Sequence, residues 1–186
     1  LPLDALPSAA PLQPAEPDPG ATLDATALLD SLEAARASPQ EQFQMARTRA
    51  FRGDYEVARA IGEHLLDAHP DYHDVRLLIG RTFAWTHQFD EARRHFREVL
   101  RRDSTYMDAY SALADAERWA ERPAAALSAL DDGLRHHPRH VPFLAKKAEI
   151  LLSSDRPQDA LLVIEQLAEV DPDHPALSTL KEKAQP

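Results

Sequence analysis

The sequence contains no cysteine and no asparagine among its 186 residues. Without cysteine the chain has no disulfide framework and no thiol chemistry, and without asparagine it has no acceptor for N-linked glycans. Its five glycines form no phosphate-binding loop. No apolar run approaches the roughly 18–20 residues that a membrane-spanning helix needs, so we expect no direct insertion into a membrane.

Basic residues are in the minority. The chain has 21 lysines and arginines against 31 aspartates and glutamates, which gives a formal net charge of −10 at pH 7. Nucleic acids and anionic bilayers both attract basic surfaces. We therefore expect neither a nucleic-acid partner nor adsorption to an anionic membrane.

Catalytic motifs are also missing. The sequence has no G-x-S-x-G nucleophile elbow, no P-loop, no dinucleotide-binding glycine motif and no H-E-x-x-H zinc motif. We predict that the protein is not an enzyme, and that it has no catalytic residues and no cofactor.

Histidines cluster in one stretch, His136-His137-Pro138-Arg139-His140. Two or three imidazoles in such a run have the spacing to converge on a metal ion. These residues fall at an exposed turn between two repeats, and the chain has no cysteine to supply a thiolate ligand. We predict a solvated turn here and no metal site.

The most informative feature is a repeat of 34 residues, which recurs four times without insertion at 39–72, 73–106, 107–140 and 141–174. The eighth position is always small: Ala46, Gly80, Ala114, Ala148. The twentieth is always alanine: Ala58, Ala92, Ala126, Ala160. Position 24 is bulky in three repeats (Phe96, Leu130, Ile164; Gly62 differs), and position 32 is proline in three (Pro70, Pro138, Pro172; Ser104 differs). Small residues let two helices approach closely, and proline ends a helix.

These positions and this period resemble the tetratricopeptide-repeat (TPR) family over residues 39–174. The resemblance implies an all-α fold, a right-handed TPR solenoid of four helix pairs. Each pair would have a helix A, a turn near positions 15–17, a helix B and a second turn at the proline.

The flanks of the repeats complete the predicted organisation. Residues 1–21 hold six prolines, three acidic residues and no basic residue, which favours an extended, disordered tail. Residues 22–38 place apolar side chains on one helical face and are predicted to form an N-terminal capping helix. Residues 175–186 are predicted to form a C-terminal capping helix.

The resemblance also assigns a binding surface. In the family, positions 2, 5, 9, 12 and 13 of helix A line the concave groove. From the residues at these positions we select ten candidate groove-binding residues: Arg47, Phe51, Asp74, Leu77, Arg81, Trp85, Asp115, Arg118, Trp119 and Glu149. Both tryptophans of the chain fall on position 13 of adjacent repeats.

Two interpretations of the aromatic residues at position 13 stay open. In the first, Phe51, Trp85 and Trp119 form an aromatic platform in a groove that is basic at its N-terminal end and acidic at its C-terminal end. Such a surface suits sugar rings, prolines and apolar peptide anchors. In the second, the rings fill the seam between adjacent A helices.

A narrower resemblance rests on the runs GRTFAW at 80–85, FDEA at 89–92 and LADAERW at 113–119, which are similar to the periplasmic repeats of YaiO-like and exopolysaccharide-export outer-membrane proteins. It implies an exported bacterial protein, periplasmic or extracellular. The chain begins at Leu1 and has no signal peptide of its own, so we expect that a signal peptide was removed or that the chain is a fragment.

Three functions follow from these features. The first is a non-enzymatic scaffold of the bacterial envelope or exterior that binds a peptide or protein in its groove. The second is a self-assembling, filament-forming protein in which residues 1–21 enter the groove of a neighbouring copy. The third is a polysaccharide-binding module of an exopolysaccharide system.

Overall fold

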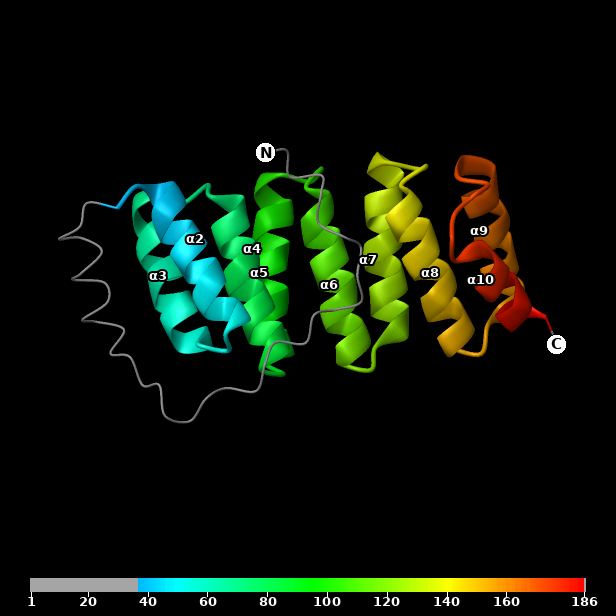
Figure 1. Cartoon of the computed structure of the whole chain (residues 1–186), viewed down its shortest axis with the longest axis horizontal. Coiled ribbons are helices and arrows are strands. Elements are labelled where there is room, and N and C mark those ends of the chain that lie inside the picture. Colours follow the sequence, from blue (N-terminus) through cyan, green and yellow to red (C-terminus); the bar gives the residue numbers. More distant parts are fainter. Residues whose placement is uncertain (1–36, 186) are drawn as a thin grey trace. The chain divides into compact units, whose positions relative to one another are not determined.

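The computed structural model describes residues 37–185, and all regular structure within them is α-helical (Figure 1). Nine helices follow one another in this range: α2 (Pro39–Phe51), α3 (Tyr55–Ala68), α4 (His73–Trp85), α5 (Phe89–Arg102), α6 (Met107–Trp119), α7 (Pro123–His136), α8 (Val141–Ser153), α9 (Pro157–Val170) and α10 (Leu177–Ala184). The described residues divide into two compact units, of which the first ends at Arg102 and the second begins at Asp103. The prediction of an all-α fold built from helix pairs is confirmed.

The helices keep the 34-residue period of the sequence. In every repeat the first helix covers positions 1–13 and the second covers positions 17–30. The turn between them therefore occupies positions 14–16, one residue earlier than expected. Position 15 has a left-handed backbone in all four repeats, with φ of 88° at Gly53, 59° at His87, 58° at Glu121 and 55° at Asp155. This residue reverses the chain so that the second helix packs against the first.

The first unit packs α2 against α3 and α4 against α5, and α3 also contacts α4. The small residues at positions 8 and 20 are buried, as are larger apolar side chains such as Ile61, Leu65 and Phe96. Burial of apolar surface is the main favourable term in folding, and alanine or glycine at the helix crossings allows the close approach that this burial needs. The core of this unit therefore lies along the contact of each helix pair.

The second unit pairs α6 with α7 and α8 with α9, and α10 packs on α9 and α8. Leu177, Leu180 and Ala184 are buried on one side of α10, while its lysines stay exposed. This helix covers part of the α8–α9 helix pair. It is shorter than the predicted segment 175–186, because the chain first turns at His174 and Ala176.

The start of α2 differs from the sequence-based prediction, which placed Ser38 at the end of a preceding helix. Ser38 instead caps α2: its backbone N–H donates to Glu41 Oε2 at 2.7 Å, and its Oγ accepts from the Glu41 N–H at 3.3 Å. This reciprocal pair is a capping box, and Pro39 at the first helical position reinforces it. The predicted tail 1–21 and the remainder of the helix predicted at 22–38, up to residue 36, lie outside the described residues.

Within residues 37–185, no helix combines the length and the apolar character needed to span a bilayer.

Candidate functional site

Three aromatic rings meet at one end of the first unit, and we call them the aromatic cluster: Phe51 at the end of α2, Tyr55 at the start of α3 and Trp85 at the end of α4. The ring centroids of Phe51 and Trp85 are 5.8 Å apart with an angle of 44° between the planes. Those of Tyr55 and Trp85 are 6.1 Å apart at 46°. Both distances lie in the range of attractive aromatic pairs. Tyr55 was not among the residues predicted from the sequence.

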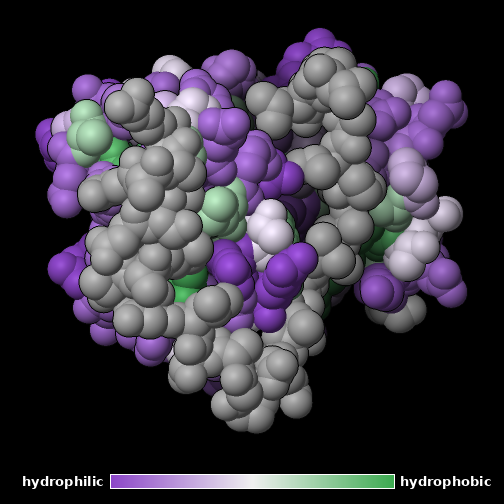
Figure 2. All heavy atoms as spheres, turned by 60° about the vertical axis from the view of Figure 1, so that its left-hand side comes forward, coloured by the Kyte–Doolittle hydropathy of each residue, from purple (hydrophilic) through white to green (hydrophobic). Residues whose placement is uncertain are grey.

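The aromatic cluster is partly open to solvent. Phe51 is 45% exposed, and among the described residues only Leu162 is a second large hydrophobic side chain of that kind. In Figure 2 the described residues that can be seen are mostly hydrophilic, with hydrophobic residues in small separate patches. Trp85 is half-buried and packs against the apolar core of the first unit. Phe51 and Trp85 therefore contact each other at the ends of α2 and α4, and nearly half of the Phe51 side chain remains available for contact.

Two arginines accompany these rings. Arg47 precedes Phe51 by one helical turn and Arg81 precedes Trp85 by one helical turn, which places each arginine beside its ring on the same helix face. Both arginines are half-buried. Within residues 37–185 neither arginine forms an ion pair, and a guanidinium group can bind a carboxylate through paired hydrogen bonds. We call Arg47, Phe51, Tyr55, Arg81 and Trp85 the aromatic–arginine surface.

The other two candidate residues of the first unit, Leu77 and Asp74, are not part of the aromatic–arginine surface. Leu77 is only 2% exposed, because its apolar side chain is part of the core, and it offers no surface to a ligand. Asp74 is exposed in the first turn of α4, where a carboxylate interacts favourably with the helix N-terminus.

In the second unit the structure surrounds Asp115 with partners. Lys146 Nζ donates to Asp115 Oδ2 at 2.9 Å and to Ser111 Oγ at 2.9 Å, and thus joins α8 to α6. Arg118 lies 4.0 Å from the other carboxylate oxygen of Asp115. Sequence reasoning missed Lys146, which occupies position 6 of its repeat and had no assigned role. Much of the charge of Asp115 is therefore compensated within the protein.

The remaining candidates of this unit are Trp119, which is half-buried at the end of α6, and Glu149, which is exposed on α8. Trp85 belongs to the first unit and Trp119 to the second. A continuous stripe of rings across both units, and a groove with one basic and one acidic end, stay predictions.

Metal binding and histidine chemistry are two alternatives to peptide binding, and the described residues give little support to either. Residues 37–185 contain no group of three histidine, aspartate or glutamate side chains that could hold a metal ion. Burial, together with Arg76 and Arg94, lowers the pKa of His95 to about 4. Its ring stacks on Phe83 with the centroids 5.4 Å apart. His95 is therefore a neutral packing residue at pH 7.

Comparison with known proteins places this geometry in context. The family model described as "Tetratricopeptide repeat" matches residues 52–116 and 120–184. Comparison with curated proteins gives no match. Among solved structures, MamA (41-end) from Desulfovibrio magneticus RS-1 aligns with a TM-score of 0.64 and 16% identity over 81% of this chain and 85% of that chain.

Two further structures show the same likeness. TTC0263 from Thermus thermophilus, a thermophilic TPR protein, aligns with a TM-score of 0.60 and 19% identity over 79% of this chain and 81% of its own. YrrB, described as a TPR protein with an unusual peptide-binding site, aligns with a TM-score of 0.60 and 18% identity over 86% of this chain and 82% of its own. At these identities the likeness shows the fold. The narrower resemblance to YaiO-like proteins finds no support in these matches and stays a prediction.

Proposed function

The chain belongs to the tetratricopeptide-repeat family, and from this premise we propose that it is a non-enzymatic scaffold that binds a protein or peptide segment through the aromatic–arginine surface. The observation that carries the proposal is the contact between Phe51 and Trp85, which leaves Phe51 45% exposed. An exposed ring held by a second ring is a rigid apolar anchor point, and it loses little conformational entropy when a ligand binds.

The chemistry of the surface defines the ligand class. Flat aromatic faces suit prolines and apolar side chains, and unpaired guanidinium groups bind carboxylates through two parallel hydrogen bonds. An extended acidic peptide that contains proline or another apolar anchor meets both requirements. The description of YrrB names a peptide-binding site, which supports a peptide ligand for a protein of the same fold.

A binding experiment with a defined peptide tests the proposal. The probe is a fluorescein-labelled synthetic peptide with the sequence of residues 1–21, which has six prolines, three acidic residues and no basic residue. Its fluorescence anisotropy is followed as the full chain is added. We expect the double variant Arg47→Glu, Arg81→Glu to bind at least tenfold more weakly, because two charge-assisted contacts are replaced by repulsion.

The matched control is the double variant Arg97→Glu, Arg122→Glu, which changes the net charge equally and leaves the aromatic–arginine surface intact. We expect this control to bind like the unaltered chain at 0.15 M salt, where distant charges are screened. Equal weakening by both double variants would show a nonspecific charge effect and would refute the assignment of the surface.

Self-assembly is the second candidate. Arg47 and Arg81 form no ion pair within residues 37–185, and residues 1–21 supply acidic groups in the same chain, which favours it. A tail of one copy bound to the surface of another is a heterologous contact, which forms rings or open filaments. Light scattering and electron microscopy of the full chain beside a chain that begins at Thr22 test this idea. Large assemblies that form from the full chain and not from the shortened chain support self-assembly. If both chains are monomeric, self-assembly is contradicted.

Polysaccharide binding ranks behind peptide binding. The planes of Phe51 and Trp85 are inclined by 44°, so the two rings do not form one flat platform for a sugar. Export to the periplasm or the exterior stays a prediction from the sequence, and fractionation of the cells that make the protein tests it.

A further inference from the structure

The second helix of the second repeat has an exposed basic face. Positions 22, 25 and 29 of a repeat lie on one stripe of its second helix, because residues three and four apart share a helix face. In α5 these positions hold Arg94, Arg97 and Arg101, and all three residues are exposed. We call this set the α5 stripe.

The other repeats show that the fold does not require arginine at these positions. The equivalent residues of the other second helices are Ala60, Glu63 and Asp67 in α3, Ser128, Asp131 and Arg135 in α7, and Leu162, Glu165 and Glu169 in α9. We call the last set the α9 stripe. Its three residues are exposed, and Leu162 is 61% exposed. The same three positions are therefore basic in α5, and acidic with one exposed apolar side chain in α9.

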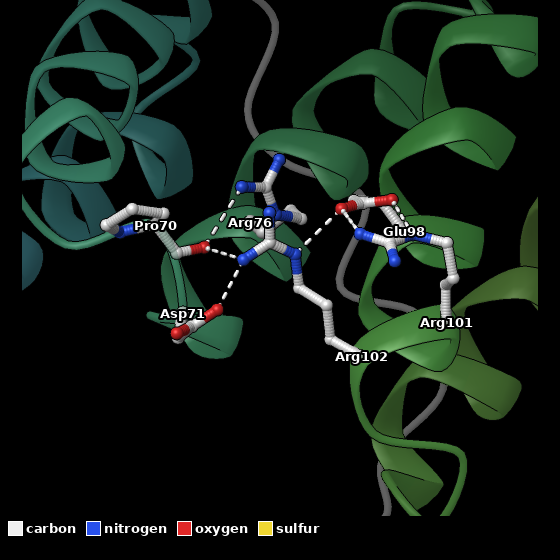
Figure 3. Close-up of polar contacts among 6 residues, drawn as sticks. All are labelled: Pro70, Asp71, Arg76, Glu98, Arg101 and Arg102. Atoms are coloured by element: carbon white, nitrogen blue, oxygen red, sulfur yellow. Dashed lines mark hydrogen bonds and ion pairs between the residues drawn. The ribbon is translucent and has the colours of Figure 1, made fainter.

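At the end of α5 one carboxylate serves two arginines (Figure 3). Glu98 accepts hydrogen bonds of 2.7 Å from Arg101 Nε and from Arg102 Nε. These hydrogen bonds lower the pKa of Glu98 to about 2, so it stays ionised. Arg102 also reaches the turn after α3, where it donates to the Pro70 carbonyl at 3.0 Å and pairs with Asp71. Glu98 therefore compensates the charge of Arg101 only in part.

The rest of α5 also has more basic than acidic charge. Arg94 forms an ion pair with Glu91 on the same helix. Arg97 forms no ion pair within residues 37–185. The helix as a whole contains five arginines against three acidic residues. A positive charge therefore remains on its exposed face.

The charge of α9 is opposite to that of α5. Its sequence contains three acidic residues and no basic residue. Glu165 and Glu169 form no ion pair within residues 37–185. Glu169 also borders a cleft, and it forms no ion pair with the three basic residues there, Arg135, Arg139 and Lys147. The α9 stripe thus presents two carboxylates, four residues apart, beside an exposed leucine.

The charges of the two units differ in the same sense as the two stripes. Residues 37–102 carry eleven basic and ten acidic side chains, whereas residues 103–186 carry nine basic and fifteen acidic ones. A contact between α5 of one copy and α9 of another therefore joins a nearly neutral unit to an acidic one. Such a contact meets less electrostatic repulsion than a contact between two second units.

We propose that the α5 stripe binds the α9 stripe of a second copy of this chain. Positions 25 and 29 have the same spacing on both helices, so Arg97 and Arg101 can pair with Glu165 and Glu169 at the same time. Leu162 packs on the aliphatic part of an arginine side chain of the α5 stripe. Because the contact joins unlike surfaces it is heterologous, and it can extend into rings or open filaments. It uses neither residues 1–21 nor the aromatic–arginine surface.

Charge reversal in the full chain tests this contact. The α5 reversal is Arg97→Glu with Arg101→Glu, and the α9 reversal is Glu165→Arg with Glu169→Arg. Sedimentation velocity measures association at protein concentrations up to about 1 mM and at about 0.15 M salt, where repulsion between distant charges is screened and ion pairs in contact persist. Each reversal is expected to raise the dissociation constant at least tenfold, because like charges then face each other. The α9 reversal also lowers the net negative charge of the chain, so its loss of association cannot come from overall repulsion.

The two reversals together should restore the contact. An equimolar mixture of the two variants again brings opposite charges together, and so does the fourfold variant that contains both reversals. Both are expected to associate with a dissociation constant within about threefold of that of the unaltered chain. Failure to restore association in variants that circular dichroism shows to be folded overturns the proposal. A full chain that stays monomeric at every concentration also overturns it.

Matched controls make the same changes of charge elsewhere. Glu63→Arg with Asp67→Arg alters positions 25 and 29 of α3, and Arg122→Glu with Arg139→Glu alters two exposed arginines of the second unit. Neither control is expected to weaken association. Weakening by a control as large as that by the matching reversal would show a nonspecific charge effect and would refute the assignment of the stripes.

A smaller change serves if the α5 reversal does not fold, since Arg101 binds Glu98 within the helix. Arg97→Glu and Glu165→Arg then replace the two reversals, first separately and then together. Each alone is expected to weaken association, and the two together are expected to restore it. The absence of this restoration contradicts the contact.

The same measurement separates this contact from self-assembly through residues 1–21. The double variant Arg47→Glu, Arg81→Glu is expected to associate like the unaltered chain if the stripes form the contact. If this variant is monomeric while the α5 reversal still associates, assembly runs through the aromatic–arginine surface and the contact between the stripes is refuted. Binding of the labelled peptide of residues 1–21 should be unchanged by either reversal, so the proposed function stands or fails independently.

Discussion

The ring of Phe96 lies where a side chain at position 80 would begin: a Cβ added to Gly80 would be 2.5 Å from Phe96 Cε1. The other three repeats have alanine at this position, Ala46, Ala114 and Ala148, and all three are buried. Glycine in the second repeat is therefore matched to the phenylalanine that packs against it. The ring is fully buried and has little freedom to move away.

We predict that Gly80→Ala destabilises the protein although alanine favours helices. Overpacking of a core costs about 1–3 kcal/mol, and the gain in helix propensity returns about 1 kcal/mol, so the free energy of unfolding should fall by up to about 2 kcal/mol. Urea unfolding followed by circular dichroism measures the change. The double variant Gly80→Ala, Phe96→Leu should recover part of the loss relative to Phe96→Leu alone. An unchanged or stabilised Gly80→Ala would contradict the close contact.

A second prediction concerns the turn within each repeat. Glu121 has φ of 58°, in the left-handed region where a Cβ is unfavourable, and it is exposed. Glu121→Gly should stabilise the protein by about 0.5–1 kcal/mol, because the relief of backbone strain exceeds the added entropy of the unfolded chain. The reverse change at the equivalent position, Gly53→Ala, should destabilise it by a similar amount. Thermal unfolding of both variants beside the unaltered chain measures the two changes in stability. If both variants were stabilised, or both destabilised, the explanation by backbone strain would be refuted.

A third prediction is a dependence of stability on pH. The pKa of His95 falls from 6.5 to about 4 on folding, first through burial and then through Arg76 and Arg94. The unfolded chain therefore binds more protons than the folded chain between these values. The free energy of unfolding should therefore fall as the pH is lowered from about 6.5 to about 4. Below about pH 4 both states bind the proton, and His95 should cause no further decrease.

The variant His95→Phe isolates this effect, because a phenyl ring keeps the stacking on Phe83 and cannot titrate. The stability of the unaltered chain, measured against this variant, should decrease by about 1–2 kcal/mol between pH 7 and pH 4, a value reduced for partial exposure of the ring. Other titrating groups such as Glu98 are common to both proteins and cancel. Parallel curves for the two proteins would show that His95 is not the responsible group.

Sequence periodicity predicted the helices well because packing acts at fixed positions of the repeat. Alanine at position 20 and proline at position 32 determine where two helices cross and where the second one ends, so four gapless copies located the helix pairs. The one-residue error in the turn arose because the period of the repeat locates the turn region without fixing its first residue. Ser38 was misplaced because the predicted helix was extended up to Pro39, whereas serine is a favoured N-cap and Ser38 caps α2.

The candidate site was harder to predict, because its contacts join positions with no constant residue type. Arg102 and Pro70 are 32 residues apart, and their hydrogen bond is recognisable only once position 30 is known to meet the preceding turn. Leu77 was assigned to the groove by family position and is buried, since an apolar side chain there lowers its free energy by packing into the core. Lys146 had no family role, and only its distance to Asp115 reveals what it does.

The last prediction asks whether Asp115 acts in structure or in binding. Its carboxylate accepts a hydrogen bond from Lys146 Nζ at 2.9 Å, and both side chains are 25% exposed. Lys146→Met and Asp115→Asn should each destabilise the protein by about 0.5–1 kcal/mol, as for partly exposed ion pairs, and a double-mutant cycle should give a coupling of at least about 0.5 kcal/mol. Because Lys146 also reaches Ser111, the loss for Lys146→Met should be the larger of the two. A coupling near zero would mean that the ion pair does not stabilise the fold. In that case Asp115 is available to a ligand, as the family position implies, and Asp115→Asn should then change peptide affinity while leaving stability unaltered.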